Sequence, residues 1–172
     1  MLIRILLFFF LSFAISETIY AQGSDEIYTI YLIRHAEKVL TDKNDRDPEL
    51  TQCGHDRAKE IASFLGELKF SSVYSTDFKR TRSTARPLSD SQGLETIIYN
   101  HREMEEFVEV LRAKKEDAVV FGHSNSTANL AGLLVGKDIP EIDHGEYNLI
   151  FQVVVCEDQA RLHILRSSFN CE

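Results

Sequence analysis

The 172-residue sequence is poor in cysteine, proline and basic side chains. Its three cysteines, Cys53, Cys156 and Cys171, include no C-x-x-C pair, which excludes a disulfide framework and a zinc signature of that type. One disulfide is permitted in an oxidising compartment, but the sequence does not select the pair. No Pro-rich linker, internal repeat or shift in composition divides the chain, which indicates a single domain.

Basic residues are outnumbered by acidic ones, 19 against 27, which gives a net charge of −8. A field of this sign repels a phosphate backbone and argues against nucleic acid as a partner. An anionic substrate would have to be held by a local cluster of cations. The sequence also lacks an H-E-x-x-H motif and clustered carboxylate–histidine spacing, so we expect no metal and no other cofactor.

The first 21 residues differ in character from the rest of the chain. Arg4 precedes a nearly unbroken apolar run that ends at Ile15 and is followed by polar residues. A spanning helix needs about 20 apolar residues, whereas a shorter run after a cation is typical of a secretory signal peptide. We predict cleavage after Ala21 and a periplasmic or secreted domain at 22–172 without stable membrane insertion. An uncleaved membrane anchor is the alternative.

Strand-like and helix-like segments alternate along the predicted mature chain. Runs rich in β-branched and aromatic residues predict strands at 27–33, 72–74, 96–99 and 118–121. Apolar spacing predicts a helix after Thr51, one at 78–88 that is cut off or bent near Pro87, and two around 104–111 and 125–135. Two final strands, at 149–155 and 161–165, flank a polar turn and read as an antiparallel hairpin.

This alternation predicts an α/β fold with a mostly parallel central sheet, helices on both faces and a C-terminal antiparallel edge hairpin. Ligands of such sheets bind beyond the carboxyl ends of the strands. Three polar clusters stand at those ends, and they are Arg34-His35, the run from Lys79 to Arg82, and His123-Ser124-Asn125.

Two histidines and at least two arginines on one rim form a local anion site that the net charge does not reveal. Gly122 permits a tight turn, and a helix beginning near Asn125 points free N–H groups at the same place. A tetrahedral phosphate is the simplest occupant. Because one neutral imidazole can attack phosphorus while another holds or donates a proton, the cluster predicts phosphoryl transfer through a phosphohistidine.

Several ordered blocks resemble the histidine phosphatase superfamily, whose signature is Arg-His-Gly at the end of the first strand. These blocks are Arg34-His35-Ala36-Glu37, Leu50-Thr51-x-x-Gly54, the run from Tyr74 to Ala85, and the run from Phe121 to Asn125. They occur in the family's order and span nearly the whole mature chain. The resemblance implies a phosphoglycerate-mutase-like fold. Within the family, the chain most resembles the small phosphoglycerate-mutase-like and phosphohistidine-phosphatase-like bacterial members.

The resemblance also implies roles for particular residues. His35 corresponds to the nucleophile that becomes phosphorylated, and Arg34 corresponds to a phosphate-binding arginine. Arg80 corresponds to the second such arginine, and His123 to the histidine that binds a phosphate oxygen and stabilises the transferring group. Asn125 is a candidate helper in substrate binding.

The chain departs from the family pattern at two points. Ala36 replaces the usual glycine, as in small bacterial members. The family's acid is not clearly marked; Glu103 is the nearest match for the proton donor, although a carboxylate there also suits the first turn of the next helix. Short members without an obvious acid favour substrates with a good leaving group, such as phosphohistidine. Arg82, two positions after Arg80, is expected on another face of its helix.

Two other functional classes compete with this interpretation. The run from Gly122 to Ser126 resembles the G-x-S-x-G elbow of serine hydrolases, with Ser124 as nucleophile, His144 or His163 as base, and Asp143 as the orienting acid. That alternative leaves the predicted anion cluster unexplained. The other alternative is a non-catalytic secreted module that binds a phosphorylated ligand. By default, the remaining histidines are interpreted as structural or surface residues, namely His55, His101, His144 and His163.

The sequence therefore predicts a phosphatase without a cofactor that hydrolyses a phosphate monoester or phosphoramidate through His35. Its expected partner is a small phosphorylated substrate or a phosphoprotein. A phosphoglycerate mutase would need an inserted segment to enclose its intermediate, and the distance along the chain from Arg80 to His123 leaves little room for one.

Overall fold

The computed structural model describes residues 27–171 except Lys43. The predicted signal peptide at 1–21 therefore lies outside the described residues. Within the described part of the chain, none of the helices combines the length and the apolar character needed to cross a membrane.

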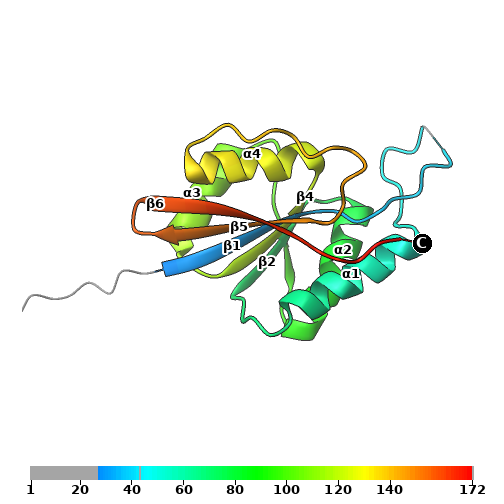
Figure 1. Ribbon diagram of the computed structural model, residues 1–172, viewed down its shortest axis with the longest axis horizontal. Coiled ribbons are helices and arrows are strands. Elements are labelled where there is room, and N and C mark those ends of the chain that lie inside the picture. Colours follow the sequence, from blue (N-terminus) through cyan, green and yellow to red (C-terminus); the bar gives the residue numbers. More distant parts are fainter. Residues whose placement is uncertain (1–26, 43, 172) are drawn as a thin grey trace, which may run out of the picture.

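A six-stranded sheet in the order β3-β2-β4-β1-β5-β6 forms the centre of the molecule (Figure 1). Four strands are mutually parallel, and they are β1 (Ile27–Arg34), β2 (Ser72–Ser75), β3 (Thr96–Ile98) and β4 (Ala118–Gly122). The last two, β5 (Leu149–Cys156) and β6 (Gln159–Arg166), form an antiparallel hairpin that joins the sheet through β1. The predicted fold class and edge hairpin are confirmed.

Helices cover both faces of the sheet (Figure 1). Apolar side chains of α1 (Gln52–Leu65) and α2 (Lys79–Gln92) pack on one face, and those of α3 (Met104–Lys114) and α4 (Ser124–Val135) pack on the other. Strand β1 supplies both layers, because Ile30 and Leu32 face α3 and α4 while Tyr31 and Ile33 face α1 and α2. This double burial explains why the strand is apolar throughout.

Two local predictions had different outcomes. Thr51 is the N-cap of α1, where its Oγ1 accepts a hydrogen bond from the Gly54 backbone N–H at 3.0 Å. The prediction that the next helix is cut off near Pro87 was wrong in its end point, since α2 continues to Gln92. A proline removes one helical hydrogen bond, and the fully buried Leu88 packs in the core directly after it and stabilises the continuing turn.

A disulfide joins the first turn of α1 to the C-terminal tail. It pairs Cys53 with Cys171, whose Cα atoms lie 5.7 Å apart, and Cys156 stays outside it. Beside the bridge, the buried Arg57 forms a salt bridge of 2.6 Å with Glu37 and donates to the Phe169 carbonyl at 3.1 Å. The tail is thus attached to the loop that follows β1.

Candidate active site

The register of three neighbouring strands brings the predicted site residues to one edge of the sheet. Arg34 at the end of β1 is level with Gly122 at the end of β4, and β2 ends beside the same part of β4. The His35 backbone N–H donates to the Gly122 carbonyl at 2.9 Å. As a result, the rings of His35 and His123 lie with their centroids 5.6 Å apart.

These residues line a pocket of about 470 Å³ at the carboxyl ends of the strands. Five of the six predicted site residues line it, namely Arg34, His35, Arg80, His123 and Asn125. The sixth, Glu103, is the N-cap residue of α3 and is not among the lining residues. Its role as proton donor stays a prediction. The described residues that line the pocket include no carboxylate.

His35 is held in one orientation. Its side chain is almost fully buried, and its Nδ1 donates to the Ala36 carbonyl at 2.8 Å. With the proton on Nδ1, the lone pair is on Nε2, which is the nitrogen available to attack an electrophile. The Ala36 backbone N–H donates to Thr84 Oγ1 at 3.0 Å, and this hydroxyl donates to the Arg80 carbonyl at 2.7 Å. Thr84 thereby links the nucleophile's loop to the helix that carries Arg80.

His123 is positioned by short polar and backbone contacts. Its Nε2 lies 3.1 Å from Thr76 Oγ1, while its Nδ1 is buried without a hydrogen-bond partner in the described structure. Its backbone N–H donates to Ser126 Oγ at 2.8 Å. Gly122 is needed beside it, because a Cβ there would lie 2.8 Å from Ser126 Oγ and 2.9 Å from Tyr99 Oη. The unpaired Nδ1 is suited to a hydrogen bond with a ligand.

Arg34 connects the pocket to the segment that precedes β5. Its Nη1 donates to the carbonyls of Asp143, His144 and Glu146 at 2.8, 3.1 and 2.8 Å. Its guanidinium carbon lies 4.1 Å from the centroid of the Tyr147 ring, and its buried Nε has no partner in the described structure. One edge of the guanidinium thus holds the segment before β5 in place. The Nε atom has no protein partner and is therefore available to bind an anion.

Arg80 is oriented by the loop between β1 and α1. Its Nη1 lies 3.6 Å from Asp47 Oδ1 and 3.4 Å from the Arg46 carbonyl, and its buried Nε is also unpaired. The same Asp47 Oδ1 accepts a hydrogen bond from the Lys79 backbone N–H at 2.9 Å. Phe78, the N-cap residue, makes no capping bond through its side chain. Asp47 therefore supplies the cap of α2 from a distant loop and faces Arg80 as well.

Both histidines are neutral near pH 7. Burial lowers the pKa of His35 to about 3; the hydrogen bond to the Ala36 carbonyl opposes this shift, and the smaller effects of the nearby charges of Arg34 and Arg80 add to it. Burial followed by the charge of Arg80 lowers the pKa of His123 to about 3. Burial and then the two arginines also lower the pKa of Lys38. The pocket thus combines two unprotonated imidazoles with an excess of positive charge.

Sequence reasoning missed five residues of this region. Lys38, Leu40, His144 and Tyr147 line the pocket, and the His101 ring lies 5.3 Å from that of His123. His101 closely follows β3, so the rule that parallel strands end at one edge could have found it. The segment before β5 could also have been placed there, because a strand antiparallel to β1 begins where β1 ends.

The serine hydrolase alternative lacks the required geometry. Ser124 Oγ donates to Glu141 Oε1 at 2.8 Å rather than to a histidine. A metal centre is also poorly supported in the described part of the chain. The one close group of potential ligands is Glu37, Cys53 and Cys171, and its cysteines form the disulfide while its carboxylate pairs with Arg57.

Comparisons with known proteins agree with this site. The model of the histidine phosphatase superfamily (branch 1) matches residues 30–109. "Probable phosphoglycerate mutase GpmB" of Escherichia coli O1:K1 / APEC is 29% identical over 116 residues, which is 65% of this chain and 54% of that protein. The chain therefore spans about half the length of the curated relatives that it matches.

Solved structures show the same fold. The protein histidine phosphatase SixA complexed with tungstate superimposes with a TM-score of 0.67 at 17% identity, covering 80% of this chain and 96% of that one. A mycobacterial glucosyl-3-phosphoglycerate phosphatase gives 0.67 at 14% identity, covering 83% and 100%. The alpha-ribazole phosphatase of Shigella flexneri gives 0.63 at 17%, covering 84% and 99%. Over residues 30–109 the chain is therefore similar to the histidine phosphatase superfamily, and it shares the fold of these solved structures.

Proposed function

We propose that the protein is a phosphatase that hydrolyses a phosphate monoester or a phosphoramidate through a phosphohistidine on His35. The observation that carries this proposal is the composition of the pocket. A buried and a half-buried imidazole, both neutral, line the pocket together with two arginines whose Nε atoms are unpaired, and no carboxylate lines the described pocket. Such a site attracts a phosphoryl dianion and presents an unprotonated nucleophile to it.

In the first step, His35 Nε2 attacks phosphorus while Arg34 and Arg80 hold the phosphoryl oxygens. The N–P bond forms as the bond from phosphorus to the leaving group breaks, and the bonding pair stays with the leaving group. His123 donates a hydrogen bond to a phosphoryl oxygen, on which negative charge is concentrated. In the second step, water attacks phosphorus, the N–P bond breaks, and its electron pair returns to Nε2 as phosphate is released.

The leaving group must accept a proton or depart as an anion. With no carboxylate lining the pocket, solvent supplies this proton unless Glu103 reaches the leaving group in the bound state. Solvent protonation favours leaving groups that depart easily, which include the imidazole of a phosphohistidine. The proposed partners are accordingly a phosphoprotein or a small phosphorylated molecule, and the fold is shared with the protein histidine phosphatase SixA.

A phosphoglycerate mutase is the second candidate, because the curated relatives carry that name. The two activities share the phosphohistidine and differ in which acceptor takes the phosphoryl group. A mutase returns it to a bound phosphoglycerate, whereas a phosphatase gives it to water. We favour water because the pocket has no carboxylate lining to act on a sugar-acid hydroxyl.

Phosphate release tests this proposal. We expect the protein to release phosphate from a generic aryl phosphate in the presence of a chelator, and His35→Ala to lose at least about a thousandfold in kcat. A mutase would instead interconvert phosphoglycerates faster than it releases phosphate. If the folded protein hydrolyses neither an aryl phosphate nor a phosphohistidine peptide, the proposal is wrong, and a mutase or a phosphate-binding module is left.

We also propose that the protein acts in the periplasm or outside the cell. The Cys53–Cys171 disulfide supports this location, because such bonds persist mainly in oxidising compartments. The apolar segment at 1–21 is the expected export signal. Cell fractionation of a C-terminally tagged chain tests the location, and a protein that stays cytosolic with free thiols at both positions would contradict it.

A further inference from the structure

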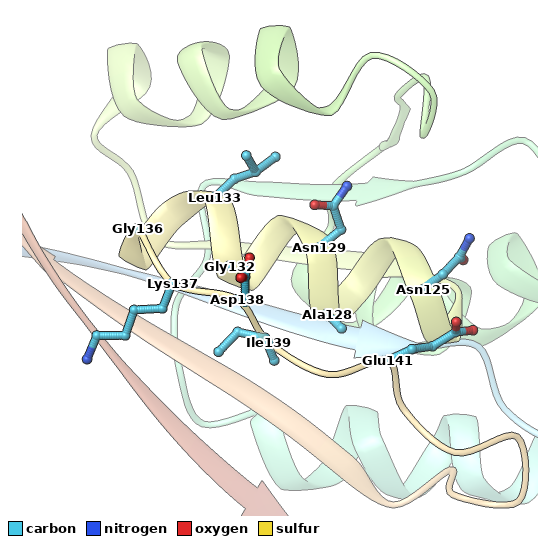
Figure 2. A pocket seen from close by; sticks show the side chains of 10 residues that line it. All are labelled: Asn125, Ala128, Asn129, Gly132, Leu133, Gly136, Lys137, Asp138, Ile139 and Glu141. Carbon is cyan, nitrogen blue, oxygen red and sulfur yellow. The ribbon is translucent and has the colours of Figure 1, made fainter.

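A second hollow adjoins the catalytic pocket along helix α4 (Figure 2). It has a volume of about 500 Å³, and Asn125 lines both cavities. A second link is the hydrogen bond of 2.8 Å from Ser124, which lines the catalytic pocket, to Glu141, which lines the hollow. We call this hollow the α4 groove. The two cavities therefore lie side by side at the N-terminal end of α4, with Asn125 between them.

The α4 groove has two walls, and both are formed by ordered parts of the fold. One wall is a stripe of α4 at helical spacing, formed by Asn125, Ala128, Asn129, Gly132 and Leu133. The other wall is the segment 136–141, which returns along the helix.

Hydrogen bonds attach this second wall to α4. The Lys137 backbone N–H donates to the Gly132 carbonyl at 3.0 Å, and the Ile142 backbone N–H donates to the Ser124 carbonyl at 3.4 Å. A Cβ on Gly132 would lie 2.6 Å from the Lys137 carbonyl oxygen, so glycine permits this close approach. The groove therefore has a defined shape before any ligand binds.

The polar side chains of the groove are opposite in character to those of the catalytic pocket. Asn125 and Asn129 offer amide groups, and Asp138 and Glu141 offer carboxylates. Figure 2 shows the side chain of Lys137, the one cation among the lining residues, extending away from Asn125 and Glu141. A ligand part that carries a second phosphate or a carboxylate is repelled here, whereas a cation or an N–H donor is attracted.

We propose that the α4 groove binds the leaving-group side of the substrate, and that this side is a peptide segment with a basic side chain next to the phosphorylated residue. The inference rests on the proposed function and specifies its substrate class. A peptide supplies backbone N–H and C=O groups for the two asparagine amides, and its lysine or arginine pairs with Asp138 and Glu141. The cationic pocket would then bind the phosphoryl group, and the acidic groove would bind the basic side chain of the same substrate.

A binding experiment separates this proposal from the proposed activity. The background is His35→Ala, which cannot form the covalent intermediate, so that equilibrium binding is measured without turnover. The probes are two pentapeptides with a central phosphotyrosine that differ in carrying lysine or glutamate directly after it, and inorganic phosphate serves as the reference ligand. Isothermal titration at low and at physiological salt gives the ratio of the two dissociation constants.

We expect the lysine peptide to bind about fivefold to tenfold more tightly than the glutamate peptide at low salt, and less so at higher salt, as for two exposed charge pairs. The Asp138→Asn/Glu141→Gln double variant should bring the ratio close to one. Glu109→Gln changes the charge of an exposed side chain on α3, outside the groove. It is the matched control and should keep the ratio of the two dissociation constants.

Asn129→Leu removes a hydrogen-bonding amide without changing the charge, and it should weaken both peptides by a similar factor of about three. A ratio near one in the parent protein, or a ratio that persists in the double variant, would overturn the proposal. So would binding of phosphate without binding of either peptide. Failure to bind phosphate at all would count against the proposed function itself.

Discussion

The two sides of the catalytic pocket are built in different ways. On one side, His35, Arg80 and His123 follow the ends of parallel strands or begin the next helix, and the register of the sheet fixes their positions. On the other side, the segment 136–148 is held through its backbone. Its N–H groups donate to carbonyls of α4, and its carbonyls accept hydrogen bonds from the Arg34 side chain. Under the proposed function, the sheet determines how phosphate is bound, and this segment determines how the leaving group is recognised.

After that of His35→Ala, the largest expected effect comes from Arg80, one of two arginines at the start of α2. Arg80 lines the pocket, whereas Arg82 is exposed and pairs with Asp77, as expected for another face of the helix. We expect Arg80→Ala to lower kcat/KM for an aryl phosphate by about a hundredfold or more, because a buried charge-assisted contact to phosphate is lost. Arg82→Ala should change it by less than about threefold. Equal losses in the two variants would contradict the assignment of Arg80.

The next prediction concerns the close packing behind His123. In Gly122→Ala the new methyl group would contact Ser126 Oγ and Tyr99 Oη at under 3 Å, so Ser126 must move and His123 with it. We expect kcat to fall by about tenfold and the free energy of unfolding by about 1–3 kcal/mol, as for other overpacked sites. Steady-state kinetics and urea unfolding measure both. A variant with normal stability and normal kcat would show that His123 needs no such support.

A smaller effect is expected for the loop that orients Arg80. Asp47→Ala removes both the cap of α2 and the carboxylate beside Arg80, and we expect KM to rise by about fivefold with a smaller change in kcat. Asp47→Asn should keep the cap and recover part of the loss. Glu49→Ala is the control, since Glu49 pairs with the neighbouring Lys79 at the surface. An equal effect of Glu49→Ala would mean that the loop as a whole matters, and not Asp47.

The sequence patterns predict mainly the side of the pocket that is formed by the ends of the parallel strands. Alternating apolar runs predicted the sheet and both helical layers, and five of the six site residues that were predicted line the pocket. Tyr147 and His144 carry no local pattern, and finding them requires the further step of pairing the predicted antiparallel hairpin with β1 through β5. The Cys53–Cys171 pairing likewise depends on the path of the tail over α1 and could not be read from spacing.

The smallest predicted effect is on stability as a function of pH. The pKa of His35 and of His123 is about 3 in the folded protein, below the usual value near 6.5 in an unfolded chain. Between these two values the unfolded state binds more protons, so stability is lost as the pH falls below about 6.5. Each histidine contributes a slope of up to about 1.4 kcal/mol per pH unit, which denaturant unfolding can resolve.

His123→Asn should reduce this slope, whereas His163→Asn, at an exposed position on β6, should leave it unchanged. Saturating phosphate should also flatten the dependence, because a bound dianion favours protonated imidazoles. An identical slope in the wild-type protein and in His123→Asn would show that burial of this histidine is not the cause.

The measurement that tests the central claim most directly is a search for the covalent intermediate. The protein is mixed with a phosphoryl donor labelled at phosphorus, quenched within milliseconds to seconds, and mapped by peptide mass spectrometry under alkaline conditions, in which phosphohistidine survives. We predict acid-labile label on the peptide that contains His35, present in the wild-type protein and absent in His35→Ala. Phosphate release by the wild-type protein without any label at His35, or label at Ser124, would contradict the account.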